Sequence, residues 1–349
     1  MMETIIENAV VARLAAFLPR TPRQLNGLQE SDAELVLLPG SGGQVLALTT
    51  DSIAEEIASG LYADPYLAGW MTVMANLSDL AAVGAEPIGL LIAETLPQGM
   101  TEKERDLLQT GIRDACLVAG SHVLGGDTNY GGRLQLTGTA VGLVPGLASM
   151  RRIGSKPGDL LFSTGKLGVG NAFAAERLSG TARDGVRYLP IARLREGRVL
   201  RSHASACMDT SDGLFSTLDQ LGRLNDVGFE LCAEWSLLID FGAQHVAEAM
   251  GLPPWMLFAG PHGEFELVFT VHPLNAETML SAMGESGMQP ILLGRVCGTP
   301  GIALDGWGRF EPEDLADIRN RPFENQENVR EFIVSLFALE ARCRTSTQA

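Results

Sequence analysis

Three aspartates follow apolar runs that are typical of β-strands, and they carry the clearest chemistry in this sequence. Asp51 ends QVLALTTD, Asp127 follows HVLGG, and Asp209 ends ASACMD, with Asp212 close behind it in TSDGL. A carboxylate at the carboxyl end of a strand faces the crevice in which α/β proteins bind ligands. Mg²⁺ takes oxygen ligands and is usually held by a few carboxylates together with substrate phosphates. The pattern therefore predicts metal-assisted phosphate chemistry.

Two further aspartates are candidate ligands for the same predicted metal site. For some of these polar residues a purely structural role is also open. Asp79 lies in ANLSDLAAVG, an apolar helical segment in which an unpaired charge would be costly, which favours a functional role. Asp32 precedes the first predicted strand and is weak evidence alone. Asp212 or Ser211 could instead cap a helix, and Asp127 could belong to an ordinary glycine turn.

Hydrophobic periodicity predicts alternating helices and strands, and hence an α/β chain of two similar-sized lobes. We expect helices over 3–18, 66–83, 101–119, 169–179, 211–224, 240–250, 274–285 and 328–341. We expect strands over 34–38, 44–50, 87–96, 121–126, 134–144, 205–209, 265–271 and 290–297, and in DLLFSTG. The turn PGSGG makes a β-hairpin of the first two strands, and the Pro-, Gly- and Arg-containing segment 145–158 is the best candidate linker.

Composition narrows the class of protein. The 349 residues are 46% hydrophobic and 19% charged, which predicts folded domains rather than disorder. A net charge of −16 argues against nucleic acid and anionic membranes as partners. We expect no membrane span, because uninterrupted apolar runs are too short. Five scattered cysteines indicate free thiols in a reducing cytoplasm and no zinc site.

Common phosphate-binding and hydrolase motifs are absent from the sequence. STGKLGVG (163–170) superficially resembles a phosphate loop, but Leu160 and Leu167 occupy positions where that motif needs a glycine and a Ser or Thr. The HRD and DFG signatures of protein kinases and the GxSxG elbow of serine hydrolases are also missing. These absences exclude three large classes of enzyme.

Several segments together carry a family resemblance across about residues 30–300. They are LTTD (48–51), ANLSDLAAVGAEP (75–87), GGDT (125–128), RRIGSKPGDLLFSTGKLG (151–168), MDTSDGL (208–214) and GEFELVFTV (263–271). In order and spacing they resemble the thiamine-monophosphate kinase family and, more broadly, the aminoimidazole ribonucleotide (AIR) synthase superfamily. The reactive cysteines of two sister families, the selenophosphate synthetases and the hydrogenase-maturation dehydratases, have no counterpart at the expected positions.

The resemblance implies a two-domain AIR synthase-like fold of α/β (α+β) type. An N-terminal domain, 1–148, would bind ATP and Mg²⁺ and form a β-barrel across a homodimer. A C-terminal α+β sandwich, 149–310, and a polar tail with one helix, 311–349, would follow. The resemblance thus implies a cytoplasmic homodimeric kinase acting on a small molecule.

The resemblance also implies roles for individual residues around ATP in the cleft, which would be bound through several Mg²⁺ ions. The implied metal ligands are Asp32, Asp51, Asp79, Asp127, Asp209 and Asp212, of which Asp79, Asp127 and Asp212 would be catalytic. The implied nucleotide contacts are Thr50, Gly126, Asp127, Arg152 and Ser211, and Glu264 and Glu266 would lie near the substrate.

Departures from the family pattern fall mostly in the segments that the family uses to bind the phosphoryl acceptor. Glu55–Ser59 stands where the family carries Glu-Gly-Val-His-Phe, and Gly263–Glu266 replaces its Glu-Asp-Tyr-Glu motif. Glu30–Ala33 keeps one carboxylate of Gly-Asp-Asp-Ala. These changes predict a diverged acceptor site. Two alternatives remain open: an ATP-dependent synthetase that activates a carbonyl or carboxylate, and a nucleotide-binding paralogue without turnover.

Overall fold

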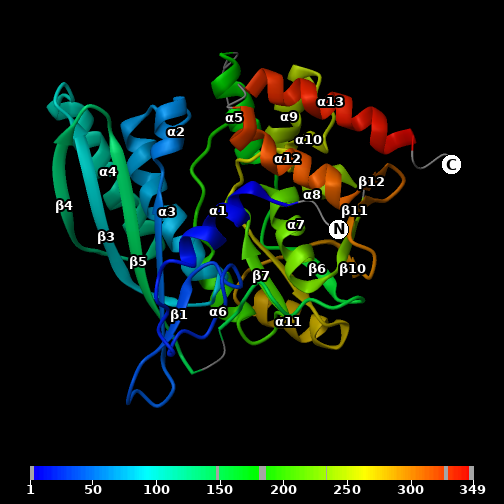
Figure 1. The fold of residues 1–349 in the computed structure, drawn as a ribbon, viewed down its shortest axis with the longest axis horizontal. Coiled ribbons are helices and arrows are strands. Elements are labelled where there is room, and N and C mark those ends of the chain that lie inside the picture. Colours follow the sequence, from blue (N-terminus) through cyan, green and yellow to red (C-terminus); the bar gives the residue numbers. More distant parts are fainter. Residues whose placement is uncertain (1–3, 147–148, 181–185, 233, 326–328, 346–349) are drawn as a thin grey trace. The chain divides into compact units, whose positions relative to one another are not determined.

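The chain folds into two compact units (Figure 1). The computed structural model describes residues 4–146, 149–180, 186–232, 234–325 and 329–345. The N-terminal unit comprises residues 23–151 and 188–202. The C-terminal unit comprises the residues up to 22, residues 152–187 and the chain from 203 onward. Each unit is therefore assembled from segments that are separated in sequence.

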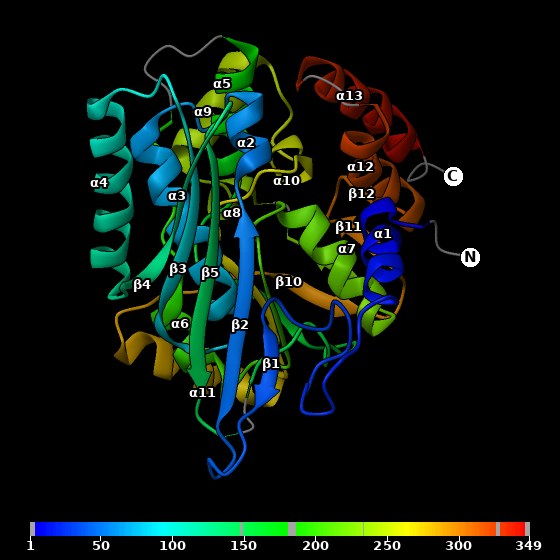
Figure 2. The same ribbon diagram turned by 60° about the vertical axis from the view of Figure 1, so that its left-hand side comes forward.

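The N-terminal unit is built on a five-stranded sheet covered by helices. Its elements are β1 (Glu34–Leu37), β2 (Val45–Ser52), α2 (Ala54–Ser59), α3 (Pro65–Ala82), β3 (Glu86–Pro97), α4 (Glu102–Ala119), β4 (Val123–Gly131), β5 (Gln135–Val144) and α6 (Leu194–Leu200). The strand order is β1-β2-β5-β3-β4, and only β3 and β4 pair in parallel. Helix α3 packs on β2 and β5, and α4 packs along α3 (Figure 2).

Local sequence explains where the two long helices of this unit begin and end. Helix α4 starts with a capping box, in which the Thr101 hydroxyl accepts from the Glu104 N–H and the Glu104 carboxylate accepts from the Thr101 N–H. It ends at Gly120, whose φ of 63° is in the left-handed region that glycine adopts freely. Helix α3 starts at the N-cap Asp64, followed by Pro65. Both helices confirm the sequence prediction.

The C-terminal unit is built on a seven-stranded sheet of order β12-β11-β8-β10-β6-β9-β7. Its strands are β6 (Leu160–Ser163), β7 (Ala206–Asp209), β8 (Gly228–Leu231), β9 (Leu267–Val271), β10 (Ile291–Cys297), β11 (Gly301–Leu304) and β12 (Gly308–Phe310). Its helices are α1 (Ile6–Ala15), α5 (Val169–Ser179), α7 (Leu214–Asn225), α8 (Trp235–Leu238), α9 (Phe241–Met250), α10 (Met256–Ala259), α11 (Pro273–Glu285), α12 (Pro312–Asn325) and α13 (Val329–Thr345).

The last two helices belong to the core of the C-terminal unit. Leu315 and Ile318 of α12, and Leu336 and Leu339 of α13, are buried in the same apolar cluster as Phe215 of α7. Helix α12 was not predicted from the sequence, because this region is mostly polar. Its few apolar residues lie on one side of the helix.

The mixed α/β architecture predicted from periodicity is confirmed, and so is the antiparallel β1–β2 hairpin. The described N-terminal sheet is open, with β1 and β4 as edges, and is not a closed barrel within one chain. Sequence reasoning missed the shortest elements, including β8, β11 and β12, which are too brief to show a period. Across the described ranges, no helix is long and apolar enough to cross a membrane.

Candidate active site

Asp79 lies in the last turns of α3 and is stabilised by a neighbour on β2. Its side chain is half-buried between fully buried apolar positions of the helix. The Thr49 hydroxyl donates a hydrogen bond to Asp79 Oδ2 at 2.5 Å. This hydrogen bond lowers the free-energy cost of placing a carboxylate among the apolar side chains of the helix. Sequence reasoning did not single out Thr49.

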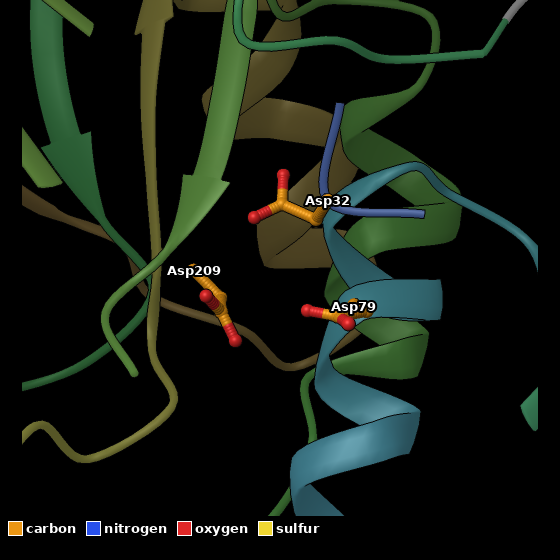
Figure 3. Close-up of side chains that lie close together, drawn as sticks. All are labelled: Asp32, Asp79 and Asp209. Atoms are coloured by element: carbon orange, nitrogen blue, oxygen red, sulfur yellow. The ribbon is translucent and has the colours of Figure 1, made fainter. Parts of the chain in front are cut away.

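Asp32 precedes β1 and comes close to Asp79 within the N-terminal unit. Oxygen atoms of the two carboxylates lie within 4.8 Å of each other (Figure 3). Two carboxylates at this separation repel unless a cation or a proton lies with them. Oxygen-only donors at this spacing fit a hard cation such as Mg²⁺.

Asp51 is held beside the same helix by its backbone. The Asn76 side chain of α3 accepts from the Asp51 N–H at 3.0 Å and donates to the Thr72 carbonyl at 2.9 Å. Gly138 of β5 lies opposite Asp51, and a Cβ there would come within 2.3 Å of the Asn76 amide nitrogen. The glycine thus makes room for the residue that fixes Asp51. The neighbouring Thr50 hydroxyl donates to the Gly138 carbonyl at 2.8 Å.

Asp127 lies in β4, the edge strand, and is well separated from Asp51. Two strands, β5 and β3, lie between β2 and β4, so about 14 Å separates the outer two at the usual strand spacing. The oxygens around one Mg²⁺ lie at most about 4 Å apart, since each is about 2.1 Å from the ion. A flat sheet with this spacing would place Asp127 and Asp51 too far apart to bind one ion.

A cavity of about 580 Å³ lies between α4 and β4, within the N-terminal unit. Gly126, Asp127 and Thr128 line one wall, and Gln109 and Arg113 of α4 line another. Ligand pockets commonly have volumes of about 300–1,000 Å³, so the cavity could hold a ligand of nucleoside size. Gly126 is required for strand pairing, because a Cβ there would come within 1.9 Å of the Ile92 carbonyl oxygen.

In the C-terminal unit, Asp209, Ser211 and Asp212 share the turn from β7 to α7. Asp209 is 1% exposed and accepts a 3.0 Å hydrogen bond from the Ser211 hydroxyl, whereas Asp212 is exposed. The N-cap of α7 is Gly213, with a φ of 79°. Neither Ser211 nor Asp212 therefore occupies the capping position, and the simpler interpretation of both residues fails.

Glu264 and Glu266 are buried beneath this turn, each 5% exposed. Glu264 accepts from the Gly168 N–H at 2.7 Å, at the start of α5, and from the Thr210 hydroxyl at 3.2 Å. Glu266 accepts from the Thr164 hydroxyl at 2.6 Å, and its carbonyl accepts from the Thr210 N–H at 2.8 Å. The two residues that sequence reasoning placed near the substrate thus hold three loops together.

Burial, reinforced by the negative charge of Glu266, raises the pKa of Glu264 to about 8 against the lowering effect of its hydrogen bonds. Glu264 is therefore mostly neutral at pH 7. Close packing of the loops explains the adjacent glycine, because a Cβ on Gly263 would come within 1.3 Å of the Thr210 carbonyl oxygen.

Arg152 lies half-buried at the start of the C-terminal unit, and Asn225 positions its segment. The Asn225 amide donates to the Arg152 carbonyl at 2.8 Å and accepts from the Gly154 N–H at 2.6 Å. Asn225 is the last residue of α7, far from Arg152 in sequence, and no motif marked it.

Comparisons with known proteins show which family this chain resembles. The family of AIR synthase related proteins, N-terminal domain, matches residues 30–144. A thiamine-monophosphate kinase of Halobacterium salinarum is 34% identical over 269 residues, 74% of this chain and 87% of that protein. The crystal structure of tt0281 from Thermus thermophilus is 29% identical with a TM-score of 0.73, covering 88% of this chain and 98% of that one.

A third comparison shows the fold alone. AaThiL complexed with AMPPCP and TMP has a TM-score of 0.71 at 22% identity, covering 86% of this chain and 93% of that one. The identity and coverage of the H. salinarum relative, together with the N-terminal match, decide the family. This chain belongs to the thiamine-monophosphate kinase family, a family of ATP-dependent kinases related to AIR synthase.

Proposed function

We propose that the protein is an ATP- and Mg²⁺-dependent kinase that converts thiamine monophosphate, or a close analogue, to the diphosphate. The observation that carries this proposal is the approach of the Asp32 and Asp79 carboxylates to within 4.8 Å. Such a pair fits a bound cation, and the family relatives are kinases. AaThiL, which shares the fold, was solved with AMPPCP and TMP.

The metal ligands we propose are Asp32, Asp51, Asp79 and Asp127 of the N-terminal unit and Asp209 and Asp212 of the C-terminal unit. The separation of Asp51 and Asp127 supports more than one ion. Mg²⁺, when bound, neutralises charge on the phosphates. We assign Asp79, Asp127 and Asp212 the catalytic role of holding the phosphates in line for transfer, because positioning and electrostatics dominate such reactions.

For the nucleotide, we propose that the base enters the α4–β4 cavity and that Gly126 and Asp127 contact the molecule there. We further assign Thr50, Arg152 and Ser211 to nucleotide binding, with the Arg152 guanidinium offsetting phosphate charge.

The acceptor site is where we propose divergence from the relatives. The segment that departs from the family's His-Phe motif forms α2, Ala54–Ser59, and contains no histidine or aromatic side chain. We place Glu264 and Glu266 next to the acceptor, where they act by positioning the turn of Asp209 to Asp212. The acceptor would then be thiamine monophosphate or a phosphate-bearing molecule that differs from it in its ring region.

We also propose that ATP binding and dimerisation reside in the part of 1–148 that folds into the N-terminal unit. The second domain then comprises most of 149–310 together with the C-terminal segment 311–349, whose helices α12 and α13 pack into its core. The enzyme would act in the cytoplasm, since none of its five cysteines forms a disulfide within the described residues.

A homodimer is expected to form through the outer face of β3 and β4 and to complete a barrel. Ile88, Leu91 and Leu124 on these strands are 43–54% exposed, which leaves apolar side chains uncovered on this face of the single chain. Replacing Leu124 by glutamate should convert a dimer to a monomer, because the charge would be buried in the interface. Light scattering on a sizing column measures this mass. Leu274→Glu on α11, at an even more exposed leucine of the other unit, is the control.

The proposed activity is tested with ATP labelled in the γ-phosphate, Mg²⁺ and a panel of phosphate-bearing acceptors that includes thiamine monophosphate. The expected result is transfer of the label to one acceptor. Label released only as inorganic phosphate together with a condensed product would favour the synthetase alternative. ATP binding with no turnover on any acceptor would favour the non-catalytic one.

A further inference from the structure

Glu94 of β3 lies at the wall of the α4–β4 cavity and is held by residues from two other elements. Gln109 of α4 donates to Glu94 Oε2 at 2.9 Å, and Thr128 of β4 donates to Glu94 Oε1 at 3.0 Å. Each oxygen therefore has one neutral donor, and the side chain is anchored from both walls. Such an arrangement fixes where the carboxylate points.

The anchored carboxylate keeps hydrogen-bonding capacity. A carboxylate offers about four acceptor positions and no donor, and the two bonds from Gln109 and Thr128 use about half of them. Arg113, the arginine of the cavity lining, pairs with Asp114 at 2.8 Å. What Glu94 can still bind is therefore an N–H or O–H donor on a ligand.

The rest of the cavity includes apolar side chains that favour an apolar ring. Ile92 and Ile112 line it and are 6% and 5% exposed, and Leu117 and Val123 also contribute apolar surface. A ring that packs on these side chains and presents an amino group to Glu94 would satisfy both features. The adenine ring, with its 6-amino group, has this chemistry.

We propose that Glu94 accepts a hydrogen bond from the 6-amino group of adenine and thereby determines the specificity for ATP. This inference rests on the proposed function, in which the base enters the α4–β4 cavity. It goes further by assigning base recognition to a residue that no motif in the sequence marked. Gln109 and Thr128 then act as positioning residues for the Glu94 carboxylate.

The test compares ATP with purine riboside triphosphate, which lacks only the 6-amino group, on the parent protein and on Glu94→Ala. Equilibrium binding is measured for the full chain with Mg²⁺ present. The parent should bind ATP about 10- to 100-fold more tightly than the analogue, the usual effect of one hydrogen bond to a charged group. Glu94→Ala should lower ATP affinity to the level of the analogue and leave binding of the analogue nearly unchanged.

Glu86→Ala, on the exposed first residue of the same strand and outside the cavity, is the matched control and should keep the parent's preference. A Glu94→Ala protein that melts like the parent and keeps the full preference for ATP overturns the assignment to Glu94. GTP binding more tightly than ATP to the parent also overturns it. If neither triphosphate binds the parent, the proposed function fails as well, so the two failures are distinguishable.

Discussion

Replacing Asp79 by asparagine is expected to lower the rate of phosphoryl transfer by about 100-fold or more, the scale at which one preorganised charged group contributes to catalysis. The asparagine oxygen can still accept from Thr49, so the helix and strand should keep their contact. The change removes one negative charge from the Asp32–Asp79 pair and with it the main attraction for a cation. The rate is measured with saturating ATP over a Mg²⁺ series.

A thermal-shift experiment separates this loss from unfolding. The increase in Tm that ATP causes in the presence of Mg²⁺ should largely disappear in Asp79→Asn, while the Tm without ligand stays near that of the parent. Asp106→Asn, an exposed position on α4, is the control and should behave like the parent. If Asp79→Asn shows the full Mg²⁺-dependent shift, Asp79 is not a metal ligand.

Replacing Glu264 by alanine is expected to lower the free energy of unfolding by about 2–5 kcal/mol. The change leaves the Gly168 N–H and the Thr210 hydroxyl without their buried acceptor and opens a void beneath the Asp209–Asp212 turn. Glu264→Gln keeps the shape and an acceptor oxygen. Because burial raises the pKa of Glu264 to about 8, the native side chain is already mostly neutral at pH 7, and the glutamine should cost little.

The same pair of variants predicts a pH dependence with a definite sign. The pKa of Glu264 is about 4.5 as an ordinary glutamate and about 8 in the folded protein. Between these values the folded state holds a proton that the unfolded state has lost, so stability falls as pH rises through this window and levels off above it. Urea denaturation of the parent at pH 6 and pH 8.5 should show this fall relative to Glu264→Gln, which lacks the titrating group.

Glu285→Gln, at the exposed end of α11, is the control and should retain the parent's pH profile. A parent and a Glu264→Gln protein with parallel profiles would show that Glu264 ionises normally in the fold.

The sequence alone predicted most of the long elements, because helices such as α3 and α4 display several turns of apolar periodicity and clear end signals. It missed β8, β11 and β12, whose three or four residues are too short to show a period. It also missed α12, whose packing contribution comes from a few apolar residues within a polar segment. These short elements form because they pair and pack with residues that are distant in sequence. The local sequence pattern gives no information about such contacts.

The metal hypothesis began with aspartates at strand ends and was extended to Asp32 and Asp79, and in the N-terminal unit the structure brings these last two together. The residues that hold the candidate ligands were not predictable. Thr49, Asn76 and Asn225 are common polar residues, and their importance comes from partners that only the fold supplies. For Glu264 and Glu266 the reverse is true. The sequence motif identified both as candidate site residues but did not predict that their side chains are buried.

The pairing of α1 with α12 has a consequence for biogenesis. The Ile6 N–H donates to the Asn320 side chain at 2.8 Å, and the Asn320 amide donates to the Thr4 carbonyl at 3.0 Å. The unit that contains both helices can therefore be completed only after residue 320 has left the ribosome. The five-stranded sheet is complete by residue 144, so it can form first during translation. Helix α1 therefore lacks its partner until α12 has been synthesised, and a ribosome-stalled chain ending before α12 should leave α1 open to proteolysis.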